Sequence, residues 1–245
     1  MTRTTRLTSL LLLLALACAS PSLEDRLATP DRSEADRARD AGRQPAAVVT
    51  FLGIEPGMTV MDLVAAGGYY TEVLSIAVGA EGTVYAQNPP IVLKFRDGAN
   101  DKALTARLAG GRLANVERLD VEITSVPVAP GSLGAAITAL NFHDIYNRGG
   151  EEAAVGFLEA VYALLAPGGV MGIIDHDGSE GQDNSELHRI ERQLVLDTLA
   201  KTRFVLEAES ELLRNPEDDH TQNVFGPGMR GNTDRFLLRL RKPAA

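Results

Sequence analysis

A short stretch around residue 65 constrains the fold of this chain more than any other. The apolar run at residues 60–64, which contains Asp62, has the length and composition of a buried strand. Four small residues follow it and lead into an apolar pattern at helical spacing: Ala65, Ala66, Gly67 and Gly68. A strand, a tight turn and a helix start bring free backbone N–H groups to the edge of a parallel sheet, where they can face a nucleotide-like ligand. The stretch predicts an α/β fold with a ligand site at this turn, although an ordinary tight turn has the same pattern.

The rest of the chain alternates between strand-like and helix-like patterns, which is typical of a doubly wound, mostly parallel sheet. Helices are predicted over residues 33–41, 46–52, 70–78, 101–109, 151–165 and 185–201, and strands over residues 60–64, 83–86, 116–123, 133–140, 170–174, 204–208 and 235–240. No helix separates the last two strands, so one of them is expected to be antiparallel.

The size and charge of the chain narrow the class of protein. Its 245 residues suffice for one large α/β domain, and 44% of them are hydrophobic, so a sizeable core is expected. The net charge of −9 argues against nucleic acid or an anionic membrane surface as the main partner. We expect a tether with a short helix at residues 18–44 and one folded domain from residue 45 to residue 245.

The first 17 residues are predicted to be an export signal. Arg3 and Arg6 precede an apolar run at residues 10–17 that is too short to span a membrane. Cys18 follows directly and resembles the lipid-modified cysteine of a bacterial lipoprotein, while plain cleavage nearby is the alternative. Either way, we expect an exported protein, periplasmic or anchored to the membrane by lipid. Since Cys18 is the only cysteine, cysteine nucleophiles, thiolate metal sites and disulfides are excluded.

Polar residues follow several predicted strands, at the edge where open α/β sheets bind ligands. Gln87 and Asn88 end the second strand. Their distance along the chain from the glycine turn is the one at which a nucleoside-binding fold holds the ribose hydroxyls. Side-chain amides can form hydrogen bonds to such a diol, although they carry no charge. The alternative is a plain loop stopped by the two prolines that follow.

Two His–Asp pairs also stand at predicted strand ends. His143 and Asp144 follow the fourth strand, and Asp175 and His176 end the fifth. A carboxylate beside an imidazole favours general-base chemistry, and the same residue types also suit a metal site. His188, which we expect at the start of the helix over residues 185–201, is a further candidate. Structural or surface histidines are the alternative for all three.

A loop of about twenty residues at 213–235 has no periodicity and is rich in charge, glycine and proline. Such loops in compact domains are usually functional lids or disordered segments. We expect a lid over the strand ends.

Motifs over about residues 31–242 resemble the class I S-adenosylmethionine-dependent methyltransferases, and most closely a bacterial group of predicted methyltransferases with export signals. The matching segments are residues 36–40 (DRARD), 66–72 (AGGYYTE), 84–88 (VYAQN), 142–144 (FHD), 167–169 (PGG), 175–176 (DH), 188–190 (HRI), 213–216 (LRNP) and 230–236 (RGNTDRF). The resemblance implies a Rossmann-like, seven-stranded sheet whose last strand is antiparallel.

The resemblance also implies a set of contacts to S-adenosylmethionine. They are Asp62, Ala65, Ala66, Gly67, Gly68 and Tyr69 near the methionine moiety, Gln87 and Asn88 near the ribose, Asp120 or Glu122 near the adenine, and Asn141 beside the sulfonium. Two departures from the wider family lie at the turn, where Val64 and Ala66 replace glycines of the common motif, and a third is the lack of an acid after the second strand.

Three hypotheses follow for the function. The first is methyl transfer to a small-molecule acceptor, with His143 or His176 as general base, oriented by Asp144 or Asp175, and His188 nearby. The second is a metal-dependent hydrolase or lyase on the same scaffold, with His143, Asp144, Asp175 and His176 as ligands. The third is a non-catalytic protein that binds S-adenosylmethionine, which the predicted export favours because the cofactor is made in the cytoplasm.

Overall fold

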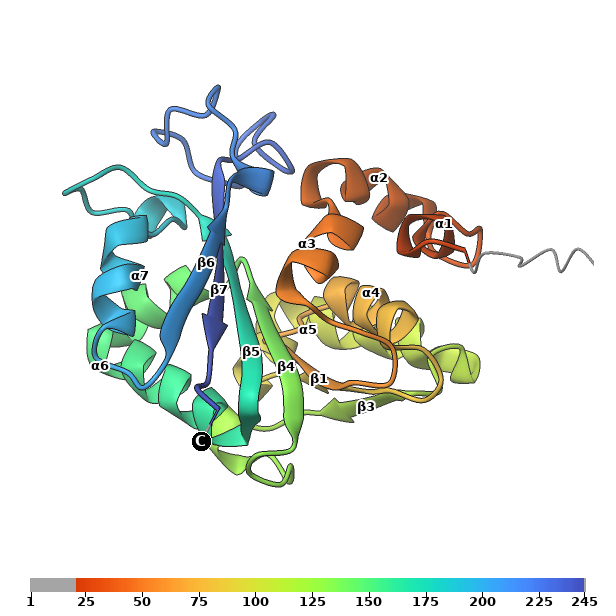
Figure 1. Ribbon diagram of the computed structural model, residues 1–245. Coiled ribbons are helices and arrows are strands. Elements are labelled where there is room, and N and C mark those ends of the chain that lie inside the picture. Colours follow the sequence, from red (N-terminus) through yellow and green to blue (C-terminus); the bar gives the residue numbers. More distant parts are fainter. Residues whose placement is uncertain (1–20, 245) are drawn as a thin grey trace, which may run out of the picture.

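The computed structural model describes residues 21–244, which form a seven-stranded sheet covered by helices on both faces (Figure 1). The strands are β1 (Thr59–Leu63), β2 (Thr83–Gln87), β3 (Val116–Leu119), β4 (Leu133–Ala139), β5 (Leu165–His176), β6 (Val205–Ser210) and β7 (Arg235–Arg241). Their order is β3-β2-β1-β4-β5-β7-β6, and only β7 runs antiparallel to its neighbours. The predicted fold class, including its one antiparallel strand, is confirmed.

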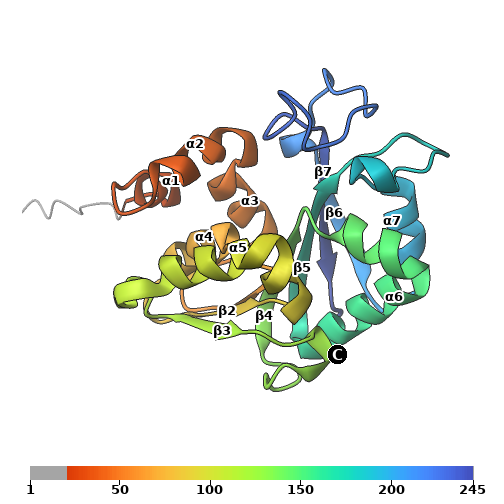
Figure 2. The ribbon, with the colours of Figure 1, turned by 180° about the vertical axis from the view of Figure 1, so that it is seen from behind.

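Helices α3, α4 and α5 cover one face of the sheet, and α6 and α7 cover the other (Figures 1 and 2). The helices are α1 (Leu23–Leu27), α2 (Glu34–Arg43), α3 (Pro45–Leu52), α4 (Tyr69–Val78), α5 (Pro90–Leu108), α6 (Phe142–Leu164) and α7 (Arg192–Leu199), with short 3-10 helices η1 (Ala109–Gly111), η2 (Ile123–Ser125), η3 (Ser185–Leu187) and η4 (Glu211–Leu213). We call the two sides of the sheet the α4 face and the α6 face.

Side chains along each strand alternate between these two faces, as the pleat of a strand requires. Val60, Ile137 and Ile174 pack in the core on the α4 face, while Met61 and Ile173 pack in the core on the α6 face. All five are at most 1% exposed, because the central strands of a mostly parallel sheet are covered by helices on both faces.

Several elements differ from the sequence-based expectation at their ends. The helix predicted from residue 185 begins only at Arg192, and the preceding residues form η3 and a bridge between Ile190 and Asp177. Helix α6 starts nine residues before its predicted start, and Gly150, which has a non-helical backbone with a φ of 72°, separates this added first part from the part that was predicted. Helix α5 starts at Pro90 and is interrupted by non-helical residues 95–98.

The N-terminal segment packs onto the domain through α1 and α2. Leu27 is buried in the core on the α4 face, so residues 21–44 contain a second helix besides the expected one. The predicted export signal and Cys18 lie outside the described residues, and export stays a prediction. Over residues 21–244, no helix has the length and apolar character needed to cross a membrane.

Candidate functional site

The turn after β1 keeps a glycine-type backbone although two of its residues are not glycine. Val64 and Ala66 have φ angles of 53° and 50°, and Gly68, which caps α4, has a φ of 83°. A left-handed backbone costs a residue with a side chain roughly 1–2 kcal/mol, and a β-branched residue adopts it rarely. The substitutions therefore leave the turn with its glycine-type shape but strain it.

Two buried amides hold the turn in this shape. The Gln87 side-chain oxygen accepts a hydrogen bond from the Val64 N–H at 3.2 Å, and the Asn88 side-chain oxygen accepts one from the Ala66 N–H at 2.8 Å. The Gln87 amide nitrogen donates to the Val121 carbonyl, and both amide side chains are fully buried. Gln87 and Asn88 thus brace the turn, and their predicted contact with a ribose stays a prediction.

Helix α5 closes the other side of the turn. A Cβ on Gly67 would lie 3.1 Å from the Ala103 Cβ, and one on Gly68 would lie 2.8 Å from the Leu104 Cδ1. The guanidinium of Arg107 donates to the Gly67 carbonyl at 2.9 Å. Gly67 and Gly68 are therefore needed for the close approach of α5.

Asp62 is a buried carboxylate at the end of β1. It accepts a hydrogen bond from the Thr71 hydroxyl at 2.6 Å, and within residues 21–244 no Lys, Arg or His nitrogen lies within 4.0 Å of it. Burial raises the pKa of Asp62 to about 7, and the Thr71 hydrogen bonds and the charges of Arg43 and Arg107 only partly oppose it. The site lacks a close cationic partner for this acid.

Arg43, at the end of α2, is a site residue that the strand-end reading of the sequence missed. Its guanidinium carbon lies 4.4 Å from the centre of the Tyr69 ring, and among the described residues it has no hydrogen bond or ion pair. Burial and the nearby Arg39 lower the pKa of Arg43. The only feature of the sequence that could have pointed to Arg43 is the charged segment at residues 36–40, shortly before it. Tyr69 itself donates to the Asp40 carboxylate at 2.6 Å.

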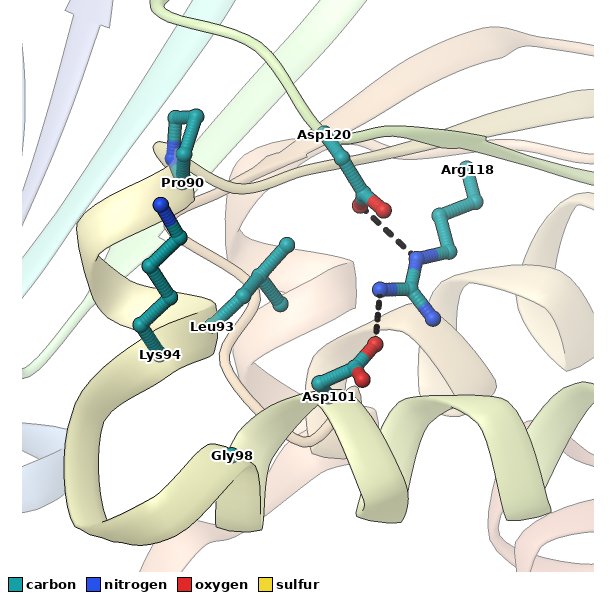
Figure 3. Close-up of a pocket in the computed structure, with 7 residues that line it drawn as sticks. All are labelled: Pro90, Leu93, Lys94, Gly98, Asp101, Arg118 and Asp120. Carbon is teal, nitrogen blue, oxygen red and sulfur yellow. Dashed lines mark hydrogen bonds and ion pairs between the residues drawn. The ribbon is translucent and has the colours of Figure 1, made fainter.

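A pocket of about 380 Å³ lies where β2 and β3 end, beside the first turn of α5 (Figure 3). Pro90 and Leu93 line it from α5, and Asp120 lines it from the segment after β3. The Asp120 carboxylate is bonded to the Arg118 guanidinium at 2.7 Å. Asp120 thus lines a pocket at the predicted adenine position, whereas Glu122 is exposed and does not line this pocket.

Asn141 lies between the ends of β1 and β4. Its side-chain amide donates to the Val64 carbonyl at 3.2 Å and to the Ala139 carbonyl at 2.8 Å. It therefore joins the strained turn to the start of α6.

The alternation of strand faces separates the residues that the sequence grouped as His–Asp pairs. Asp62 and His176 each stand two residues after an α4-face residue, Val60 and Ile174, so both point to the α4 face. Asp175 points to the α6 face, where it meets His143. The hydrogen-bond partner of the His143 ring is therefore Asp175 and not its sequence neighbour Asp144, and the His176 ring is bonded to Thr233 and not to Asp175.

His143 and Asp175 form a tight buried pair. The His143 Nδ1 lies 2.7 Å from one Asp175 oxygen, and the His143 backbone N–H donates to the other at 2.7 Å. Burial opposes the charging of both groups, but their mutual attraction outweighs it, so the pKa of His143 is raised and that of Asp175 is lowered. In the neutral form of His143, an ionised Asp175 fixes the proton on Nδ1 and leaves the lone pair on Nε2.

His176 has a different environment. Its Nδ1 lies 2.8 Å from the Thr233 hydroxyl, and Arg235 is its partner across the β5–β7 pair. Burial, which the charge of Asp175 offsets only in part, lowers the pKa of His176 to about 3. The imidazole is therefore neutral at neutral pH.

His188 lies in a left-handed turn after η3, with a φ of 54°, and not in a helix as expected. Its Nδ1 lies 3.6 Å from Asp144, and the same Asp144 oxygen lies 3.8 Å from the His143 Nε2. The rings of His176 and His143 have their centres 5.9 Å apart, and those of His143 and His188 lie 5.7 Å apart. The structure thus brings the three candidate histidines into one row.

The loop predicted to be a lid is anchored by buried charges. Arg189 is fully buried and binds both oxygens of Asp218, at 2.9 and 3.0 Å. Asp234 forms an ion pair with Arg214 at 3.0 Å and a hydrogen bond with the His220 Nε2 at 3.0 Å. Phe225 in the loop packs against His188 with ring centres 4.9 Å apart. The loop covers the end of the histidine row from a fixed position.

Comparison with known proteins adds to this geometry. No protein-family model matches the chain, and no curated protein matches it. Many solved structures do, among them a SAM-dependent methyltransferase from Aquifex aeolicus, at 20% identity and a TM-score of 0.60, over 81% of this chain and 89% of that one.

Two further matches show what this architecture hosts. The geranyl diphosphate C-methyltransferase from Streptomyces coelicolor, solved with Mg²⁺ and S-adenosyl-L-homocysteine, matches at 15% identity and a TM-score of 0.56, over 89% and 84% of the two chains. The [4+2]-cyclase SpnF matches at 14% identity and a TM-score of 0.61, over 89% and 86%. At these identities the likeness concerns architecture alone. The chain has the Rossmann-like fold of the class I S-adenosylmethionine-dependent methyltransferases.

Proposed function

We propose that this protein is an S-adenosylmethionine-dependent methyltransferase that acts on a small-molecule acceptor, with His176 as general base. One observation carries the proposal: among the described residues, a buried carboxylate, Asp62, and a half-buried guanidinium, Arg43, lie near the turn without ionic partners of their own. Asp62 has no cation within 4.0 Å, and Arg43 has no ion pair among residues 21–244. The methionine moiety carries one ammonium and one carboxylate, which match this pair.

These two residues would hold the methionine end, Asp62 the ammonium and Arg43 the carboxylate. The strained turn at Val64–Ala66 would lie beneath the cofactor, and the pocket beside Asp120 would take the adenine. S-adenosylmethionine supplies an activated methyl group, so the protein has to orient the acceptor and remove its proton.

Position favours His176 over His143 as the base. His176 shares the α4 face with Asp62, and its Nδ1 is bonded to Thr233, which leaves Nε2 to face an acceptor. The Nε2 of His143 instead faces Asp144 and His188. Since the pKa of His176 is about 3, it accepts a proton readily only from an acidic acceptor group, such as a hydroxyl with a lowered pKa.

Calorimetric titration of the purified full-length chain with S-adenosylmethionine and S-adenosylhomocysteine tests the cofactor. We expect saturable binding of both, weakened roughly tenfold to hundredfold by Asp62→Asn and by Arg43→Met, because each removes a charge-assisted hydrogen bond. Asp197→Asn and Arg203→Met, at exposed sites on and after α7, serve as matched controls. Absence of heat with either ligand up to millimolar concentration contradicts the proposal.

Transfer of radiolabelled methyl groups to a panel of phenols, catechols and carboxylic acids tests turnover. We expect His176→Gln to lower the rate about a hundredfold or more while cofactor binding persists. His220→Gln, the matched control, retains the rate. Cofactor binding with no transfer to any acceptor favours the non-catalytic binding protein instead.

A further inference from the structure

The first turn of α6 and the η3 turn bring three ligand-type side chains together on the α6 side of the histidine row. His143 and Asp144 come from α6, and His188 follows η3. One ligand atom from each of the three residues lies within 4.8 Å of the other two, and the His143 Nε2 and the His188 Nδ1 both face the same Asp144 oxygen.

From this geometry we propose that His143, Asp144 and His188 bind a divalent transition-metal ion of the zinc type, with Asp175 as a positioning residue behind His143. Two imidazoles and one carboxylate with a fourth position open are a ligand set of catalytic zinc sites. This set differs from the sequence-based alternative, because His188 takes the place of Asp175 and His176.

The distances suit such an ion after a small adjustment. Ligand atoms 2.0–2.1 Å from a tetrahedral ion lie about 3.3–3.4 Å apart. The Asp144 oxygen lies 3.8 Å from the His143 Nε2 and 3.6 Å from the His188 Nδ1, so each pair must close by only a few tenths of an ångström. The two imidazole nitrogens must approach further, and His188, which is 34% exposed, has the freedom to rotate.

Asp175 prepares His143 for this role. It accepts the Nδ1–H of His143 at 2.7 Å and the backbone N–H of His143 at 2.7 Å, so the ring is fixed with its Nε2 lone pair toward Asp144. A carboxylate behind a metal-binding histidine sets its tautomer and orientation in this way. If His143 and Asp175 acted only as a general base, they would not need His188 and Asp144 to face the His143 Nε2.

The charges around the cluster also suit a dication. Asp144 and Asp175 carry two negative charges, and the only cation in contact with Asp144 among the described residues is Arg148, at 3.2 Å and 64% exposed. Phe225 packs on the outer side of His188 and shields it from that direction. An ion bound here balances the two carboxylates.

The role of the ion rests on the proposed function, although its binding does not. The ring centres of His143 and His176 lie 5.9 Å apart, so the ion would lie near the proposed base. A bound ion would lower the pKa of an acceptor hydroxyl, so that a weak base would suffice. The proton would pass to the His176 Nε2, the acceptor oxygen would form its bond to the methyl carbon, and the electron pair of the broken S–C bond would stay on sulfur.

Titration of the chelator-stripped full-length chain with ZnCl₂, in competition with a chromophoric chelator, tests the site without any cofactor. We expect one ion per chain, and an affinity at least a hundredfold lower in Asp144→Ala and His188→Ala. Asp175→Asn should lower the affinity tenfold to a hundredfold at unchanged stoichiometry. His220→Ala and His176→Ala are the controls and should bind as the wild type does.

The absorption spectrum of the Co²⁺-loaded chain gives a second readout, since a four-coordinate site with nitrogen and oxygen ligands has visible bands that Asp144→Ala and His188→Ala should abolish. Both of these residues are partly exposed, so their variants are expected to fold, which circular dichroism checks. Absence of stoichiometric binding, or unchanged binding in His188→Ala, overturns the proposal. Titration of the chain with S-adenosylmethionine in the presence of EDTA measures cofactor binding without the ion. It therefore distinguishes a missing metal site from a failure of the proposed function.

Discussion

Two residues of the turn after β1, Val64 and Ala66, have a backbone that glycine adopts without strain. The strain persists because Gln87 and Asn88 fix the N–H groups of both residues. Strain that the surroundings hold in place is common where a ligand must be approached closely. At the residue scale, the departures from the glycine motif thus leave the shape of the turn unchanged.

Asp62 gives the pH dependence expected at this scale. The pKa of Asp62 is about 7 in the folded chain, whereas its ordinary value is 3.8. At pH values between these two, the folded state therefore keeps a proton that the unfolded state has lost. The unfolding free energy of the cofactor-free wild type should therefore fall relative to Asp62→Asn as pH rises from about 4 to about 7, by about 4 kcal/mol, and stay level above. Urea unfolding at a series of pH values measures this difference. A difference that does not change with pH contradicts the raised pKa of Asp62. Asp197→Asn is the control, and its difference from the wild type should stay constant over this pH range.

At the scale of elements, Arg107 joins three helices around the turn. It reaches from α5 to Glu72 on α4, to Asp36 on α2 at 2.8 Å, and to the Gly67 carbonyl. Both acids are almost fully buried. Arg107 therefore helps to hold α2, and with it Arg43, beside the turn.

Replacing Arg107 with methionine should lower the unfolding free energy by about 3 kcal/mol, because Asp36 loses its buried partner and Glu72 keeps only Arg112. Urea titration measures the loss. Arg148→Met on α6 removes an exposed ion pair and should change stability by about 0.5 kcal/mol or less. If both substitutions changed the free energy of unfolding by the same amount, the contacts of Arg107 would not have this stabilising role.

At the scale of the whole molecule, segments far apart in sequence close over the carboxyl ends of the strands (Figure 1). A Cβ on Gly42 in α2 would lie 2.5 Å from the carbonyl oxygen of Gly231 in the loop before β7. Gln44 also donates to the Leu212 carbonyl at 2.7 Å. The N-terminal helices and the C-terminal loop thus support each other beside the site.

Arg189 should control whether that loop stays in place. Arg189→Met removes both bonds to Asp218 and leaves this carboxylate buried without its partner, so we expect a loss of about 3–5 kcal/mol and an exposed loop. Limited proteolysis should then cut within residues 214–234 much faster than in the wild type. Arg192→Met, which removes a half-exposed ion pair with Glu209, is the control. An unchanged cleavage pattern contradicts the anchoring role.

The sequence alone predicted the sheet well, because the signals for buried strands are local. Strand-like patterns located all seven strands, and the missing helix before β7 predicted the antiparallel direction of one of the last two strands. Element ends were predicted less well before Gly150, where a further helical part of α6 precedes the kink, and at residues 165–169, where a proline and two glycines lie inside β5. Packing against neighbouring elements decides such ends.

The amino-acid sequence thus determined which residues gather at the edge of the sheet, since every strand end is marked by its own residues. Only the tertiary structure decided their partners. The pleat sends Asp175 and His176 to opposite faces, so Asp175 pairs with His143, thirty-two positions away, and His176 with Thr233. His188 reaches Asp144 only through the left-handed turn after η3. Partners of this kind depend on contacts between distant segments, which no local pattern encodes.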